Sequence, residues 1–131
     1  MAILIHGTTR KRAETIVREG PDPNFREPGR HSNEPAGLRV ESFSTYLKSG
    51  PFIADPPEEY ARRKVFLFPD EGGPVILEID VPDDIVELAT DEGGGRPLSQ
   101  GIVQFDEGSG IEELRAAWPN LAKRIVPIED K

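Results

Sequence analysis

The stretch LIHGTTRKRAETIVREG, residues 4–20, joins a short apolar run to a segment with helical periodicity. The run AILI, residues 2–5, is too short for a helix and is typical of a buried strand that ends at His6 and Gly7. A bulkier apolar residue would extend such a strand better than histidine does, and a hydroxyl would cap the following helix better. The histidine at this junction therefore needs an explanation of its own.

A helix is predicted directly after this strand. Thr8 or Thr9 can cap it, because a side-chain hydroxyl accepts a hydrogen bond from the free N–H groups of a first turn. Gly20 provides the stop, and the prolines that follow it prevent continuation. The apolar residues recur at helical spacing and share one face: Ala13, Ile16 and Val17.

The remainder of the chain predicts short strands, short helices and long loops. Residues 21–37 are rich in proline, glycine and charge and are expected to form a long surface loop. Helices are predicted after Asp55 and around Ile111–Trp118. Strands are predicted within 38–47, 49–55, 64–68, 74–82, 101–105 and 124–128. Because strands and helices do not alternate regularly, a single α+β domain over residues 1–131 is expected.

Composition and charge narrow the classes of function. A net charge of -8 disfavours nonspecific binding to nucleic acid and to anionic lipid. The basic triplets Arg10–Arg12 and Arg62–Lys64 are expected to be solvated faces of helices. The chain has no cysteine, which excludes disulfides and thiolate zinc sites. No apolar run is long enough for a membrane span and no signal peptide is recognisable, so a cytoplasmic location is expected.

His6, Gly7 and Thr8, with the helix AETIVREG after them, resemble the opening of the ADP-ribosyltransferase superfamily, in the branch that has a histidine at this position. Residues 49–65 resemble its second block, a glycine–aromatic strand and a helix start, and 73–84 resemble a strand that usually reads VLEVDVP. The resemblance implies an ADP-ribosyltransferase-like fold, in which a split, mixed β-sheet with a few short helices binds NAD.

The resemblance also implies roles for individual residues. His6 would bind the adenosine ribose, the Gly7 backbone would meet the nicotinamide carboxamide, and Thr8 belongs to the same NAD-binding segment. A neutral imidazole both donates and accepts hydrogen bonds, and glycine lets the backbone approach a flat ring. An aromatic side chain would stack on the nicotinamide, and three candidates stay open: Tyr46, Tyr60 and Phe52.

Residues 98–114 occupy the place of the family's third block, where a glutamate usually holds the ribose 2′-hydroxyl. Here the best register places Gln100, which can form a hydrogen bond but brings no negative charge to the oxocarbenium-like transition state. Loss of one such electrostatic contact typically costs about 2.7–4 kcal/mol of barrier. The candidate catalytic residues are thus Gln100 and His6, and Arg96 and Ser99 are candidates for acceptor recognition.

The leading hypothesis is an NAD-binding protein that transfers ADP-ribose to a macromolecular acceptor, as a mono-ADP-ribosyltransferase, or that hydrolyses NAD. The alternative is a catalytically inactive relative that keeps the fold as a binding or regulatory module, which Gln100 favours. An RNA 2′-phosphotransferase activity ranks third, because the chain is acidic. The expected partners are NAD and a protein acceptor; nucleic acid, membrane and metal are not expected.

Overall fold

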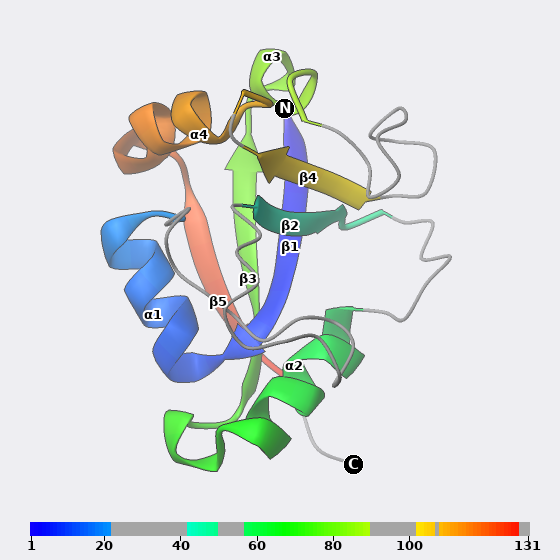
Figure 1. Ribbon diagram of the computed structural model, residues 1–131, viewed down its shortest axis with the longest axis vertical. Coiled ribbons are helices and arrows are strands. Elements are labelled where there is room, and N and C mark those ends of the chain that lie inside the picture. The colour runs from blue at the N-terminus through cyan, green and yellow to red at the C-terminus, as the bar shows by residue number, and fades with distance from the viewer. Residues whose placement is uncertain (22–41, 50–56, 90–101, 107, 129–131) are drawn as a thin grey trace.

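The computed structural model describes residues 1–21, 42–49, 57–89, 102–106 and 108–128 (Figure 1). Four α-helices, two 3₁₀ turns and five strands lie in these ranges. In chain order they are β1 (Ala2–Thr9), α1 (Arg10–Glu19), β2 (Ser42–Leu47), α2 (Pro57–Leu67), η1 (Pro69–Glu71), β3 (Pro74–Val81), α3 (Asp83–Val86), β4 (Ile102–Asp106), α4 (Ile111–Ala117), η2 (Trp118–Asn120) and β5 (Lys123–Pro127). The predicted α+β class is confirmed. None of the helices in these ranges has the length and apolarity that crossing a membrane requires.

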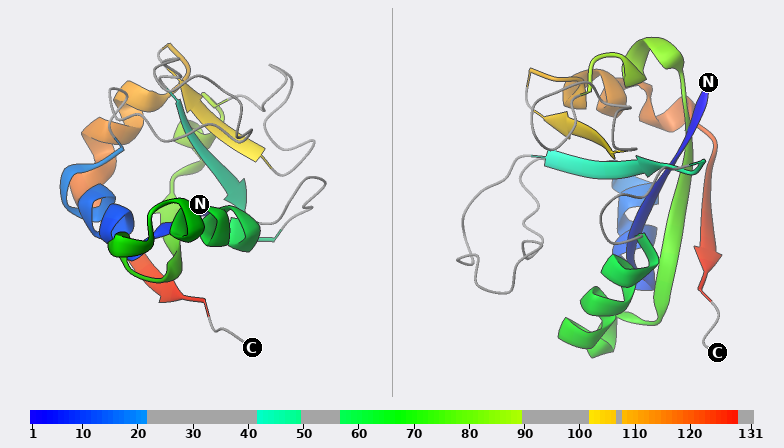
Figure 2. Two further views of the ribbon diagram at one scale, coloured as in Figure 1. Left: turned by 60° about the horizontal axis from the view of Figure 1, so that its bottom comes forward. Right: turned by 90° about the vertical axis from the view of Figure 1, so that its right-hand side faces the viewer.

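The five strands form one sheet in the order β4-β2-β1-β3-β5. All four pairings are antiparallel, so the expectation of a mixed sheet is wrong for the described strands. β1 pairs with β3 along its whole length but with β2 at two positions only, Leu4–Leu47 and Ile5–Tyr46. β2 and β4 then run steeply across the direction of β1, β3 and β5 (Figures 1 and 2). β1 and β2 therefore share only a short stretch of backbone pairing at the middle of β1, and we call the place where this pairing ends, beside His6, the split.

The junction after β1 differs from the prediction in one respect. The strand does not end at His6 and Gly7 but continues to Thr9, because β3 pairs with it as far as Thr9–Pro74. The helix prediction is confirmed: the Thr9 hydroxyl accepts a hydrogen bond from the Arg12 N–H at 3.3 Å, and Gly20 closes the helix with a φ of 86°. His6 thus lies inside a strand.

α2 is longer than predicted. Residues 64–68, which read as a strand, belong to this helix up to Leu67, and the Phe68 N–H still bonds to the Lys64 carbonyl at 2.8 Å. Apolar content favoured a strand here, but packing against β1 selects the helix, because this places Ala61 in a fully buried position. The cap Asp55 lies outside the described residues, as does nearly all of the predicted loop 21–37 and of the strand 49–55.

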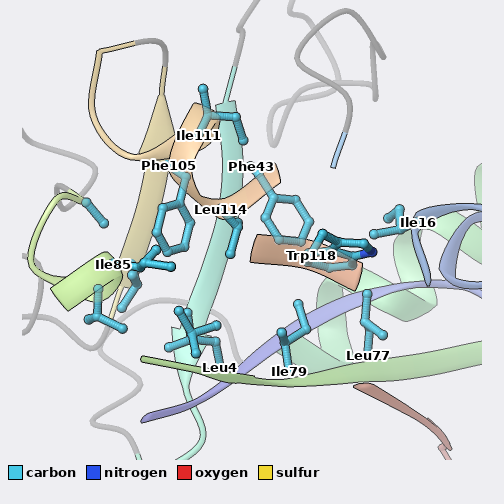
Figure 3. Close-up of a cluster of buried hydrophobic side chains, with 14 residues drawn as sticks. Leu4, Ile16, Phe43, Leu77, Ile79, Ile85, Phe105, Ile111, Leu114 and Trp118 are labelled. Atoms are coloured by element: carbon cyan, nitrogen blue, oxygen red, sulfur yellow. The ribbon is translucent and has the colours of Figure 1, made fainter. Parts of the chain in front are cut away.

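Side chains of β1 and β3 supply two apolar clusters on opposite faces of the sheet, because successive residues of a strand point to opposite sides. We call them the large and the small cluster. The large cluster joins the sheet to α1, α3 and α4, with Trp118 beside Phe43 (Figure 3). The small cluster packs under α2 and consists of Ile5, Tyr46 and Ile76, with Tyr60 and Ile128 against it. The site residues are divided between these two faces.

Candidate functional site

His6 lies where the pairing between β1 and β2 ends. Its Nδ1 is 2.7 Å from the backbone oxygen of Ser44, so a side chain joins the two strands just past the last backbone pair, Ile5–Tyr46. A carbonyl oxygen can only accept, so Nδ1 is the donor, and in the neutral ring Nε2 is then the acceptor. The strand pair therefore fixes both the orientation and the tautomer of the imidazole.

The imidazole of His6 packs on the side of the large cluster. Its ring centre is 4.8 Å from that of Phe43, and Phe43 in turn meets Trp118 edge to face at 6.4 Å. The side chain is only 8% exposed. Contact with a ribose through this ring therefore requires movement of the groups that cover it.

Gly7 is required by the packing of α2. A Cβ on this residue would overlap the Pro57 carbonyl oxygen and lie 3.2 Å from the backbone nitrogen of Ala61. The ammonium of Lys64 donates a hydrogen bond to the Gly7 carbonyl at 2.9 Å. The close approach that the resemblance assigns to a nicotinamide ring is thus made here by a helix backbone.

Lys64 is a residue that the sequence interpretation missed. The triplet Arg62–Lys64 was expected to be a solvated face, but Lys64 is half-buried and bound to β1. Pro57, Ala61 and Lys64 follow one another at spacings of four and three, which places them on one helix face. This spacing, which places Lys64 on the same helix face as the buried Ala61, was the sequence signal that could have identified Lys64.

Thr8 follows on the same strand and is fully buried. Its hydroxyl has no hydrogen-bond partner among the described residues, which is uncommon for a buried polar group. It points to the same side of β1 as His6, because the two residues are separated by one position. In this conformation Thr8 presents no atom to a ligand.

The two tyrosine candidates do come together. Tyr46 and Tyr60 stack with ring centres 6.1 Å apart and planes 26° from parallel, and the Arg63 guanidinium lies 5.6 Å from the centre of the Tyr60 ring. They belong to the small cluster, so they lie on the face opposite to His6. Phe52, Gln100, Arg96 and Ser99 lie outside the described residues.

A buried carboxylate lies on the same face as the tyrosines. Glu78 is 9% exposed and pairs with the Lys48 ammonium at 3.0 Å and with Nε of Arg124 at 3.2 Å. Arg124 also bonds to Asp80 at 2.9 Å, which lowers the pKa of the Asp80 carboxyl and raises the pKa of the guanidinium. Tyr46, Ile5, Glu78 and Arg124 form one register row across four strands. The alternation of acids in β3 was the signal for this cluster, to which sequence reasoning gave no role.

A second ion pair fixes the start of α1. Nε of Arg12 is 2.5 Å from Glu71, and the Thr9 hydroxyl donates to the same carboxylate at 3.0 Å. The hydrogen bond from Arg12 holds the pKa of Glu71 below its usual range. The guanidinium also lies 4.2 Å from the centre of the Phe68 ring. Arg12 is therefore not part of a solvated face, which corrects the expectation for the first basic triplet.

Within the described ranges, histidine and acidic side chains form no group of three that could hold a metal ion. Comparison with models of protein families, with curated proteins and with solved structures finds no match to this chain. The site must therefore be interpreted from its own geometry.

Proposed function

We propose that this chain is an ADP-ribosyltransferase-like protein that binds NAD at the split between β1 and β2, and that it transfers ADP-ribose to a protein acceptor or hydrolyses NAD. The observation that carries the proposal is the split itself. The backbone pairing of β1 with β2 stops at Ile5–Tyr46, directly beside His6 and Gly7, and the His6 side chain bonds to the Ser44 backbone oxygen just beyond it. A divided sheet next to this segment is what the resemblance implies.

The groups at the split suit parts of the dinucleotide. The Gly7 carbonyl is an acceptor for a carboxamide N–H, and Lys64, which now bonds to this oxygen, is a cation suited to a pyrophosphate. Nε2 of His6 is the acceptor for a ribose hydroxyl in the tautomer that Ser44 selects. NAD would supply the nicotinamide–ribose bond that is broken, and the residues of the chain would orient it.

Such a site would stabilise poorly the positive charge that develops on the ribose in the transition state. An amide at position 100 can position the ribose but cannot stabilise an oxocarbenium-like transition state by its charge. We therefore expect slow turnover, with release of nicotinamide as the measurable product.

A second function, a catalytically inactive binding or regulatory module, is favoured by one observation. Tyr46 and Tyr60 stack on one another, on the face of the sheet opposite to His6, so neither ring is paired with the histidine across one cleft. NAD binding would require rearrangement around α2, whereas a module with a filled site needs none.

The test is a calorimetric titration of the intact protein with NAD and with a non-hydrolysable analogue, followed by a nicotinamide-release assay. His6→Asn keeps a donor for Ser44 but removes the Nε2 acceptor, and Lys64→Gln removes the cation. Lys11→Gln, on the exposed start of α1, is the charge-matched control. Weaker binding for the first two variants with an unchanged control supports the site. No binding by folded wild-type protein at millimolar NAD contradicts it and favours the inactive module.

A further inference from the structure

We propose that the C-terminal end of α2 is a docking surface for an acidic protein segment that carries apolar side chains between its carboxylates. The surface is formed by Phe66 and Leu67 with the basic residues around them, and we call it the α2 tip. Phe66 is 85% exposed and Leu67 is 53% exposed. Contiguous exposed apolar surface, unlike apolar residues scattered singly, can mark an interaction site. The proposal does not depend on NAD binding.

Basic side chains from two distant parts of the sequence flank these apolar residues. Arg63 precedes Phe66 by one helical turn and lies on the same helix face. Arg10 reaches the same end of the molecule, because its N–H bonds to the Gly73 carbonyl at 3.1 Å and its Cβ is close to Gly72. Lys11 follows it at the exposed start of α1, and this end of α1 lies beside η1, the turn that follows α2, because Arg12 and Thr9 bind Glu71 there.

Among the described residues, acidic side chains near the tip are fewer than basic ones. Glu71 is bound by Arg12, and Asp70 and Glu14 are exposed. Glu58 and Glu59 lie at the opposite end of α2, about two turns from Phe66. The α2 tip is therefore locally basic within a chain whose net charge is -8.

The size and charge of the tip favour a protein segment over a larger polyanion. Nucleic acid and anionic membranes present negative charge over an extended surface, which would also meet the acidic remainder of the chain and be repelled. A short acidic segment contacts the tip alone. Its apolar side chains would cover Phe66 and Leu67, while its carboxylates pair with Arg10, Lys11 and Arg63 at the rim.

The experiment selects a phage-displayed library of random 16-residue peptides on the intact protein, in parallel with the double variant Phe66→Ser/Leu67→Ser. Leu88→Ser, which changes another exposed leucine, is the matched control. We expect the wild type and the control to enrich peptides that combine Asp or Glu with aromatic or aliphatic residues. The affinity of these peptides should fall at least tenfold in the double variant and should also fall at high salt.

Arg63→Gln combined with Lys11→Gln separates the charge contribution from the apolar one, and should lower the affinity without abolishing it. Enrichment of basic or uncharged peptides would overturn the proposal, as would peptides that bind the double variant equally well. Oligothymidylate and phosphatidylglycerol vesicles are titrated as further probes. If either binds through Phe66 more tightly than the selected peptides do, the surface recognises a polyanion and the proposal is wrong.

Discussion

The two faces of the sheet at β1 are stabilised by different kinds of contact. On one face, His6 lies at the edge of the large cluster, which joins three helices to the sheet around Phe43 and Trp118. On the other, the small cluster holds α2 through a tyrosine stack, with the buried Glu78 directly opposite Ile5 in the pairing of β1 with β3. The first face is mainly apolar, whereas the second combines aromatic rings with ion pairs.

This difference shows that a sequence motif within a strand does not reveal which groups surround each of its residues. His6, Gly7 and Thr8 are adjacent in sequence but do not all face the same side of the sheet, because neighbouring residues of a strand point to opposite sides. His6 and Thr8 point toward the large cluster, and Gly7 faces α2. Substitutions that disrupt the packing of one face at a time therefore test which face determines stability and which determines function.

The largest effect is expected for Trp118→Ala in the large cluster. Trp118 is buried, and its indole N–H donates to the Val17 carbonyl at 3.1 Å. Removal of so large a buried ring should cost about 3–5 kcal/mol of unfolding free energy, measured by urea denaturation. Tyr60→Ala in the small cluster should cost clearly less, because Tyr60 is only partly buried. Equal losses would show that the two clusters are equally important for stability.

Gly7→Ala should come next, at about 3 kcal/mol, because the added methyl group meets the backbone of α2 and a backbone cannot move aside cheaply. Gly73→Ala is the control, since nothing lies within 4 Å of a Cβ at that position. Hydrogen exchange gives the local readout: the amides of α2 should lose protection in Gly7→Ala, while those of α1 keep it. Unchanged protection in α2 would contradict the close packing of Gly7 against the α2 backbone.

The sequence was sufficient for elements whose signals are local. The cap Thr9, the stop Gly20 and the alternation of residues 74–81 each specify the backbone within a few residues, and these elements are confirmed. It failed where tertiary packing decides, as in residues 64–67, whose apolar content is typical of a strand but which continue α2. The face of the sheet on which each site residue lies also depends on the pairing register of the strands, and no local sequence pattern predicts that register.

Contacts between distant segments of the chain also determine the candidate site. Tyr46 and Tyr60 were alternatives for one role, and the structure places them in one stack, a relation that depends on how α2 packs on the sheet. Lys64 and Glu78 are residues whose partners are remote in sequence, so charge patterns alone gave them no role. The roles of Gln100 and Phe52 stay predictions.

Acid should weaken the ion pair that fixes α1. Glu71 has a lowered pKa in the folded protein, so its contribution to stability is complete above the unfolded pKa of glutamate, about 4.3, and is lost as the pH falls through the lower folded value. Glu71→Gln should therefore cost about 2 kcal/mol at neutral pH and progressively less in acid. Denaturation curves at a series of pH values test this, and a constant difference across the acid range would disprove it.

For His6 the expected stability effect is smaller. Loss of its hydrogen bond to Ser44 should cost about 1 kcal/mol, so His6→Gln, which cannot place a donor at the Nδ1 position, should be destabilised by about that amount. His6→Asn keeps a donor there and should be closer to the wild type. Thermal denaturation of both variants measures the difference. If Asn is the less stable of the two, the bond to Ser44 does not hold the imidazole.

The smallest effect is expected in the exposed ion pair of the second face, between Arg124 and Asp80. Both groups are solvated, so the attraction between them is screened, and Asp80→Asn should move the denaturation midpoint only slightly and less still at high salt. Glu78→Gln should move the midpoint more, because this carboxylate is buried and pairs with two cations.

The Arg124–Asp80 pair should also depend on pH. The pKa of Asp80 is lowered in the folded protein, so the contribution of this carboxylate to stability is present above the unfolded pKa of aspartate and is lost as the pH falls through the folded value. A double-mutant cycle of Arg124→Gln with Asp80→Asn, at low and high salt, isolates this pair. If its coupling persists at high salt, the second face is held together by buried electrostatics, and Glu78 belongs to a rigid network rather than to a solvated rim.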